Sequence, residues 1–544
     1  MIMKKYIGFT IIALSMGLAS CNDYLDKLPD DRAEINTVDK VSSLLVSAYP
    51  THSANFLLWM SSDNVDDNGK LYTAQPNQDQ MYRWEDVESE GNDDPRSLWN
   101  DGYERVAVAN LALEAIDEQG NPPSLQGQKA EALLCRAFAM FTLSNIFCMA
   151  YDPEKCEKYL GLPYPKTSGT SVDERGTQKE LYENINADIE AAIPLLDDNH
   201  LSVPKFHFNS KAAYAFAARF NLYYHKYDKA IEYATKVLGN NPSDILRDYS
   251  AYVSLNYTDM FHQYILSSEK ANLMLLPAYS VVGRVSTGSS LYRRYNHNMT
   301  ILGYETFWAI APWSTQTATS GSNTLYLAHR QWGTDQYVFC PTQLEEFEFT
   351  DKTGNSGYAH IIDIPFTGDE TLLERAEAYA LKGDFSNALN DMNTWMSNSC
   401  VPALPYATWS GTKTTPTLTE EYLTEYFKDM PYSEVTPTTE RSRTMRKTLH
   451  PQGFKVEANT QENLIEVILQ MRRVMNIYSG LRFQDLKRYG IEYTHFLDGE
   501  NPKVFKAGDL RGAIQLPNDV LKAGLPANPR EGDQPATVET DDNK

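Results

Sequence analysis

The chain has 544 residues and a formal net charge of −23, with 42% hydrophobic and 22% charged residues. These proportions are those of a folded globular protein and exclude collagen-like, coiled-coil and wholly disordered chains. The excess of acidic residues repels phosphate backbones, so nucleic acid is not expected as a partner. The 34 tyrosines and 8 tryptophans suit a protein that binds its ligand against flat ring faces.

The N-terminus predicts a signal peptide over residues 1–20. Residues 1–5 are basic, residues 6–20 are apolar and end in small side chains, and Cys21 follows directly. The apolar run is shorter than the ~20 residues that span a bilayer, and this order of segments is typical of secretion. Leu18-Ala19-Ser20-Cys21 also matches the lipobox of bacterial lipoproteins. We therefore expect Cys21 to be acylated and to anchor the mature chain to a membrane.

Five cysteines remain after Cys21, and an odd, sparse set is not a disulfide framework. Cys148 and Cys156 either pair with each other or stay as buried thiols, since their neighbours are apolar. No spacing of cysteines and histidines suits zinc.

Amphipathic helices follow the leader in pairs. Residues 99–117, 125–150 and 180–196 carry apolar side chains at spacings of three and four, which is typical of helices that bury one face. Within residues 209–238, Ala218 and Ala230 lie on two predicted helices that a short polar turn separates, and Pro242 ends the second. This resembles a tetratricopeptide unit, and residues 372–398 form a second copy with Ala388 in place of Ala230.

Residues 248–367 lose the helical period and are rich in Ser, Thr, Gly and aromatic residues. We expect long irregular loops there, and loops on a rigid scaffold commonly carry binding residues. Residues 528–544 are polar and acidic and predict a disordered tail. The expected fold is mostly α, a tetratricopeptide-like helical-repeat scaffold with long irregular loop insertions.

Three segments carry a family resemblance. Residues 21–29 (CNDYLDKLP) match a leader of lipidated Cys, aromatic, Leu and Pro, and residues 480–490 (GLRFQDLKRYG) match a Gly-x-Arg-aromatic-x-Asp-Leu-x-Arg signature. Residues 513–517 (AIQLP), together with Asn528-Pro529, match a closing segment. On these residues the chain resembles the SusD/RagB family of Bacteroidetes outer-membrane lipoproteins, over essentially its whole length.

The signature departs from the family at one point. Met471, Met475 and Ser479 stand where the family usually has Glu, so the buried charge network is expected to differ. Arg482, Asp485 and Arg488 are spaced by three on a predicted helix, which allows them to pair along one face. We interpret these three as structural residues, not catalytic ones.

The resemblance implies a function and a domain plan. It implies a surface-exposed, lipid-anchored protein of the outer membrane that binds oligosaccharides and delivers them to a partner SusC-like TonB-dependent transporter, without catalysis. Residues 21–527 would form a single SusD-like domain, with helical repeats at about 99–240 and 370–400, a ligand-binding insertion at about 248–367 and a C-terminal segment at about 460–527.

Three alternatives stay open. One is a peptide-binding uptake protein of the RagB type. Another is a surface glycoside hydrolase, which would need two carboxylates ~5–9.5 Å apart in a cleft. The third is a scaffold protein whose repeat groove holds a partner peptide.

No fixed sequence motif marks the residues that would contact a ligand, so we choose the candidates by residue type alone. Sugar rings stack on aromatic faces, while carboxylates and amides bind the hydroxyl groups. The aromatic candidates are Tyr72 and Trp84 in an early loop, and Trp308, Trp313, Tyr326 and Trp332 in the insertion.

Asp66 and Asp67 are the carboxylate candidates for sugar hydroxyls. They lie in residues 64–75, which partly resemble a calcium loop, but Asn64 and Gln75 stand where Asp and Glu are wanted. No cofactor is expected, and calcium remains an alternative to a solvated acidic loop.

Overall fold

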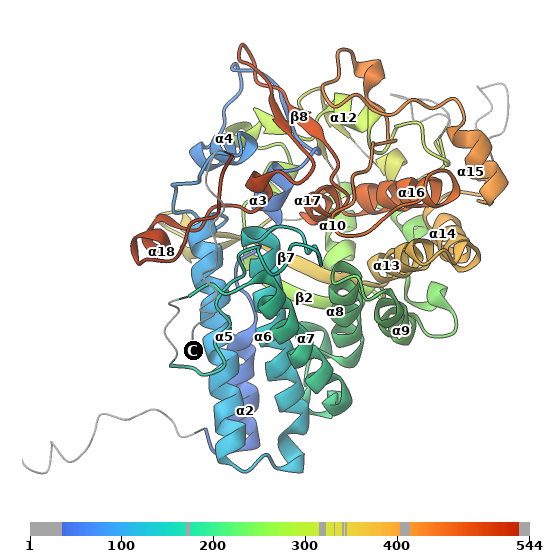
Figure 1. Ribbon diagram of the computed structural model, residues 1–544. Helices are drawn as coiled ribbons and strands as arrows, with labels where there is room; N and C mark the ends of the chain where they lie inside the picture. The colour runs from blue at the N-terminus through green and yellow to red at the C-terminus, as the bar shows by residue number, and fades with distance from the viewer. Residues whose placement is uncertain are drawn as a thin grey trace, which may run out of the picture.

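The computed structural model describes residues 35–169, 174–314, 323–330, 332–339, 342, 345–402 and 414–531. The signal peptide and Cys21 therefore lie outside the described residues. Helices form most of the ordered structure, and the mostly α fold with tetratricopeptide-like helix pairs is confirmed (Figure 1).

The longer helices are α2 (Val38–Leu45), α5 (Pro95–Glu118), α6 (Gln126–Phe147), α7 (Gln178–Ala192), α8 (Ser210–Tyr223), α9 (Tyr227–Leu238), α10 (Tyr257–Ile265), α13 (Gly368–Leu381), α14 (Phe385–Ser399), α15 (Glu420–Phe427), α16 (Thr460–Met475) and α17 (Leu481–Arg488). The shorter ones are α3 (Asn55–Met60), α4 (Pro76–Tyr82), α11 (Val282–Ser286), α12 (Met299–Tyr304) and α18 (Asn518–Lys522). The strands are β1 (Asp66–Asp67), β2 (Asn272–Tyr279), β3 (Tyr295–Asn296), β4 (Trp332–Thr334), β5 (Tyr337–Phe339), β6 (Glu346–Asp351), β7 (Ser356–Thr367), β8 (Tyr493–His495) and β9 (Lys503–Phe505).

Helices α2, α5, α6 and α7 form the lower part of the molecule in Figure 1. They fall where the periodicity of the sequence predicts helices. Proline at the first position starts α5, and Thr177 and Glu180 form a capping box that starts α7. Among the described helices, the stretch Pro123–Phe147 is long and apolar enough to cross a membrane, but most of its side chains are buried in the protein, as in a core helix.

The two repeat units form as expected. Helix α8 packs on α9, α13 packs on α14, and α13 also contacts α9, so the pairs stack. Ala218 and Ala230 are fully buried between the helices of the first pair, which allows the backbones to approach closely. The turns between helices use His225 and Gly383 at positive φ angles of 60° and 80°.

The insertion after α9 is more regular than the sequence indicates. Strands β2, β7 and β6 form an antiparallel sheet in the spatial order β2–β7–β6. Residues 272–276 (NLMLL) are buried, and such a short apolar run fits a covered strand. The insertion therefore contains a sheet in addition to its irregular stretches, because the polar composition of the whole insertion hides this strand.

The C-terminal segment packs against the beginning of the chain. Helix α17 contacts both α16 and α3, which brings the signature residues against the start of the chain. Asn528 is buried, and its side-chain amide donates hydrogen bonds to the carbonyl oxygens of Phe147 (3.0 Å) and Ile514 (2.7 Å). The predicted disordered tail is thus wrong at its first residue, because Asn528 still belongs to the folded body.

Candidate functional site

Trp84 and Trp313 lie in the hydrophobic core. The Trp84 ring stacks on His495 with centroids 4.1 Å apart, and its Nε1 donates to the Ser61 carbonyl oxygen at 3.1 Å. Trp313 has no exposed surface and packs against Trp395 at a centroid distance of 5.4 Å. The expectation that these two rings face a ligand is corrected, because burial leaves them no open face.

The other four aromatic candidates lie at different places in the fold. Trp308 is half-buried, and its Nε1 donates to the Ala328 carbonyl oxygen at 3.0 Å. Tyr72 and Tyr326 are also half-buried, so each keeps some surface for a ligand. Trp332 begins β4, and its side chain lies outside what the structure describes. For Tyr72, Trp308, Tyr326 and Trp332, ligand contact stays a prediction.

Both acidic candidates are engaged by arginines. Asp66 lies 2.9 Å from an Nη of Arg443, and burial raises the pKa of its carboxyl group. Asp67 lies 3.2 Å from Arg294 and also accepts from the backbone N–H groups of Gly69 (2.8 Å) and Asp498 (3.0 Å). These contacts hold neighbouring loops together, and ligand contact through Asp66 or Asp67 stays a prediction.

The signature arginines form a buried ion network, as the structural interpretation predicts, although the partners differ. Arg488 pairs with Asp485 along the helix at 3.4 Å. Arg482 instead makes two hydrogen bonds to Asp63, at 2.9 and 2.8 Å. Burial alone would raise the pKa of Asp63, but Arg473 and Arg482 outweigh burial and hold that pKa well below its usual range.

The arginines of this network also pair with acidic residues of another element, helix α13. Arg472 lies 3.1 Å from Asp485 and 2.8 Å from Glu370 of α13, and Arg488 lies 2.6 Å from Glu377 of the same helix. The network therefore ties α16 and α17 to a repeat helix. Its groups are buried and paired, so it serves structure.

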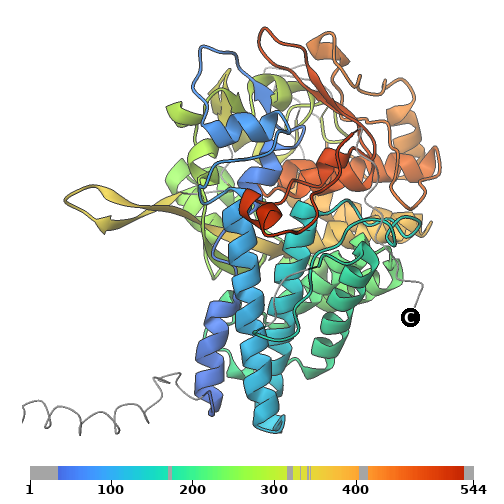
Figure 2. The ribbon, with the colours of Figure 1, turned by 60° about the vertical axis from the view of Figure 1, so that its left-hand side comes forward.

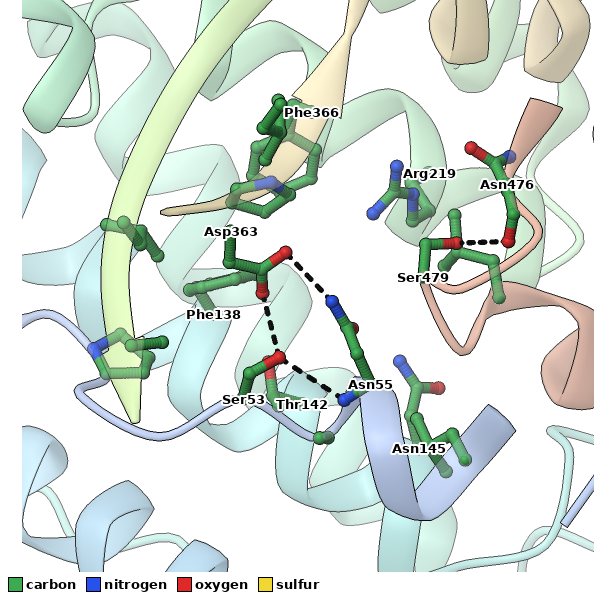
Figure 3. Close-up of a pocket in the computed structure, with 18 of the residues that line it drawn as sticks. Ser53, Asn55, Phe138, Thr142, Asn145, Arg219, Asp363, Phe366, Asn476 and Ser479 are labelled. Atoms are coloured by element: carbon green, nitrogen blue, oxygen red, sulfur yellow. Dashed lines mark hydrogen bonds between the residues drawn. The ribbon is translucent and has the colours of Figure 1, made fainter. Parts of the chain in front are cut away.

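A separate cavity of about 120 Å³ lies between α6, the start of α3 and the end of β7 (Figure 3). Helix α8, the start of α13 and the connection from α16 to α17 complete its walls. Several lining side chains are half-buried, including Thr142, Asn145, Asp363 and Ser479, so the cavity is accessible from solvent. None of the eight ligand-binding candidates is among its described lining residues.

The polar side of the cavity is built around Asp363. Its carboxylate accepts hydrogen bonds from the Asn55 side-chain amide at 3.0 Å and the Ser53 hydroxyl at 3.2 Å (Figure 3). Burial raises the pKa of Asp363. A carboxylate has about four acceptor positions, so Asp363 keeps capacity for a donor from a ligand.

The apolar side of the cavity includes phenylalanine and aliphatic side chains. Phe138 of α6 and Phe366 of β7 lie with centroids 5.6 Å apart. The Arg219 guanidinium lies 4.8 Å from the Phe366 centroid and donates to Glu374 at 2.7 Å. Burial raises the pKa of Glu374 to about 7, against the opposing effect of Arg219. Apolar side chains and hydrogen-bonding groups thus line one space, which is the usual composition of a small-molecule site.

The cavity was missed in the sequence because its residues come from helices and strands, not from polar loops. Residues 361–366 (IIDIPF) do carry one signal. A single carboxylate inside an apolar run must find partners or shift its pKa when it is buried, so Asp363 stands out as a candidate on that ground.

Comparisons with known proteins agree with this fold. Residues 23–222 match the model of the family SusD-like_3, described as "Starch-binding associating with outer membrane". A search of curated proteins gives no match.

Solved structures give matches over most of the chain. A SusD superfamily protein from Bacteroides thetaiotaomicron has 18% identity and a TM-score of 0.58, over 91% of this chain and 100% of that one. A SusD-like carbohydrate binding protein from Bacteroides vulgatus has 15% identity and a TM-score of 0.56, over 87% and 89%. A SusD superfamily protein from Bacteroides fragilis has 16% identity and a TM-score of 0.55, over 89% and 97%. The N-terminal part of the chain thus matches a SusD-like family model, and the chain shares the fold of SusD superfamily structures.

Proposed function

We propose that the protein binds carbohydrate at the outer membrane and takes a sugar unit into the cavity between α6 and β7. The observation that carries this proposal is the pairing of Asp363 and Asn55 with the Phe138 and Phe366 rings around one space. A sugar needs both kinds of surface, because its C–H groups pack against apolar side chains while its hydroxyl groups need hydrogen-bond partners. The description of the matching family, starch binding in association with the outer membrane, supports the same ligand class.

The size of the cavity limits what it holds. Pockets for drug-sized ligands measure ~300–1,000 Å³, whereas this cavity measures about 120 Å³. It therefore fits one terminal sugar unit, and the rest of an oligosaccharide would lie outside it. Binding of this kind is weak, since a shallow site buries little area.

Two further parts of the proposal, the lipid anchor and the transporter partner, rest on the N-terminal sequence and on the resemblance to the SusD/RagB family. Cys21 of the lipobox would carry the lipid anchor, and a SusC-like TonB-dependent transporter would receive the bound sugar at the cell surface. A non-catalytic role fits the carboxylates of the cavity. Glu370, the other lining carboxylate beside Asp363, is engaged by Arg472 at 2.8 Å and by the Asn476 amide.

A glycan array probed with the chain lacking residues 1–21 tests the proposal. We expect retention of one class of oligosaccharide and no release of reducing ends on prolonged incubation. Asp363→Ala removes a charge-assisted hydrogen bond worth ~1.5–3 kcal/mol, which corresponds to about 10- to 100-fold weaker binding.

The matched control is Glu118→Ala, which makes the same change in net charge at an exposed residue at the end of α5. Retention of peptides but not glycans would favour the RagB-type alternative. Turnover of a glycan that a single carboxylate substitution abolishes would refute the non-catalytic role.

A further inference from the structure

Strands β6 and β7 continue beyond the body of the protein as a projecting hairpin, seen at the left of Figure 2. We call residues 345–360 the hairpin arm. Strand β2 accompanies β7 only as far as the pair Tyr279–His360, so the outer part of the arm consists of two strands. Residues 346 and 348–356 of the arm are exposed.

The arm is fixed to the body at its base, and its tip is an ordered turn. Glu345 accepts two hydrogen bonds from Arg284, both at 2.8 Å, which fixes the start of β6. At the tip, the Asp351 carboxylate accepts the Thr353 backbone N–H at 2.8 Å within the turn. Such contacts make a preorganised arm, which reduces the entropy cost of binding a partner.

The two faces of the arm differ in chemistry. In the antiparallel register, Glu346 lies opposite His360 and Glu348 opposite Tyr358, so these four side chains share one face. Phe347 and Phe349 lie on the other face with ring centroids 4.9 Å apart.

Large apolar surface on the arm remains open to solvent. Phe349 is 45% exposed and Tyr358 is 51% exposed. Acidic and aromatic surface therefore alternate along β6.

The outer edge of β6 is unpaired within the described part of the chain, because the sheet order is β2–β7–β6. An open edge presents backbone N–H and C=O groups to which another extended segment can add as a strand. Pairing of two copies of this arm would bring the glutamates of both copies together in a chain of net charge −23, and like charges directly opposite each other destabilise a sheet.

We propose that the hairpin arm binds an extended segment of a partner protein, which adds to β6 as a strand and carries basic side chains at every second position. The basic side chains would lie beside Glu346 and Glu348, and the intervening aromatic or β-branched side chains would pack beside Phe347 and Phe349. This partner surface is separate from the sugar cavity and does not depend on it.

A charge-exchange experiment on the chain lacking residues 1–21 tests this site. The probes are the synthetic peptides (Lys-Val)4 and (Glu-Val)4, and their binding is measured by calorimetry. We expect (Lys-Val)4 to bind, with deuterium exchange slowed at the amides of residues 346–351. The double variant Glu346→Lys/Glu348→Lys should bind (Lys-Val)4 at least about tenfold more weakly and should gain binding of (Glu-Val)4.

The control is Asp117→Lys/Glu118→Lys, which makes the same change in net charge at the exposed C-terminal end of α5. There lysines are favourable to the helix dipole, and we expect unchanged peptide binding. Phe349→Ala should weaken binding several-fold with an unchanged Tm.

Equal loss of binding in the control and in the arm variant would overturn the proposal. So would protection from exchange outside the arm, or sedimentation as a dimer that the arm variant abolishes.

Discussion

Replacement of Trp313 separates a packing role from a ligand-binding role most sharply. The side chain is fully buried and packs against Trp395 at 5.4 Å. A buried tryptophan removes ~150–250 Å² from water, which is worth about 4–6 kcal/mol at 25 cal/mol per Å². Measured truncations of large core residues cost a similar ~3–5 kcal/mol. We therefore expect Trp313→Ala to destabilise the protein strongly.

Thermal unfolding gives the assay. The entropy of unfolding is ~2.1 cal/mol/K per residue, so over roughly 500 residues 1 kcal/mol lowers the Tm by about 1 °C. Trp313→Ala should thus lower the Tm by roughly 3–6 °C. Trp313→Phe should cost less, because the ring is kept and the Trp313 Nε1 has no hydrogen-bond partner in the described structure. A wild-type Tm for Trp313→Ala, together with lost glycan retention, would refute this reasoning.

Three further predictions concern buried charges and the acidic loop. Arg482→Met removes two hydrogen bonds from the buried Asp63 and leaves it with Arg473, 3.4 Å away, so it should cost up to ~3–5 kcal/mol. Adding Asp63→Asn should recover part of that loss of Tm, and strictly additive losses would contradict the pairing. Burial raises the pKa of Asp93 to about 7, although the hydrogen bonds from Ser280 and Val281 act to lower it. Between about pH 4 and 7 the folded state therefore holds a proton that the unfolded state has lost. The stability of the protein should accordingly fall as the pH rises from about 4 to 7. Asp93→Asn should flatten that decline in Tm and be the more stable form at pH 8, and an unchanged pH profile would contradict the assignment. Added calcium should leave the Tm unchanged, since arginines engage Asp66 and Asp67; a rise in Tm that Asp67→Asn abolishes would show a calcium site.

The helical scaffold follows from local sequence. Alanines at the close contact of α8 and α9, and the 3.6-residue period of α5 to α7, depend on neighbours in the chain. The sheet of β2, β7 and β6 joins segments about 80 residues apart, and no local pattern encodes such a pairing. For that reason the sequence of the insertion predicts loops, although the insertion contains a sheet.

The candidate site was harder to predict for a related reason. Whether an aromatic ring faces solvent or the core depends on tertiary packing, so composition could not separate Trp313, which is buried, from Tyr72, which is half-buried. The partners within the ion network could not be predicted from the sequence for the same reason. The sequence indicates that Arg482 is structural, but its partner Asp63 is more than 400 positions away.

Titration of the mature chain with the glycan that the array identifies is the most direct test of the central claim, that the cavity between α6 and β7 takes the sugar. We predict that Asp363→Ala and Asn55→Ala each weaken binding at least about tenfold while the Tm stays within a few degrees of wild type. Full affinity in both variants, with loss of binding from Tyr72→Ala or Tyr326→Ala instead, would contradict the account and return the ligand to the loop residues.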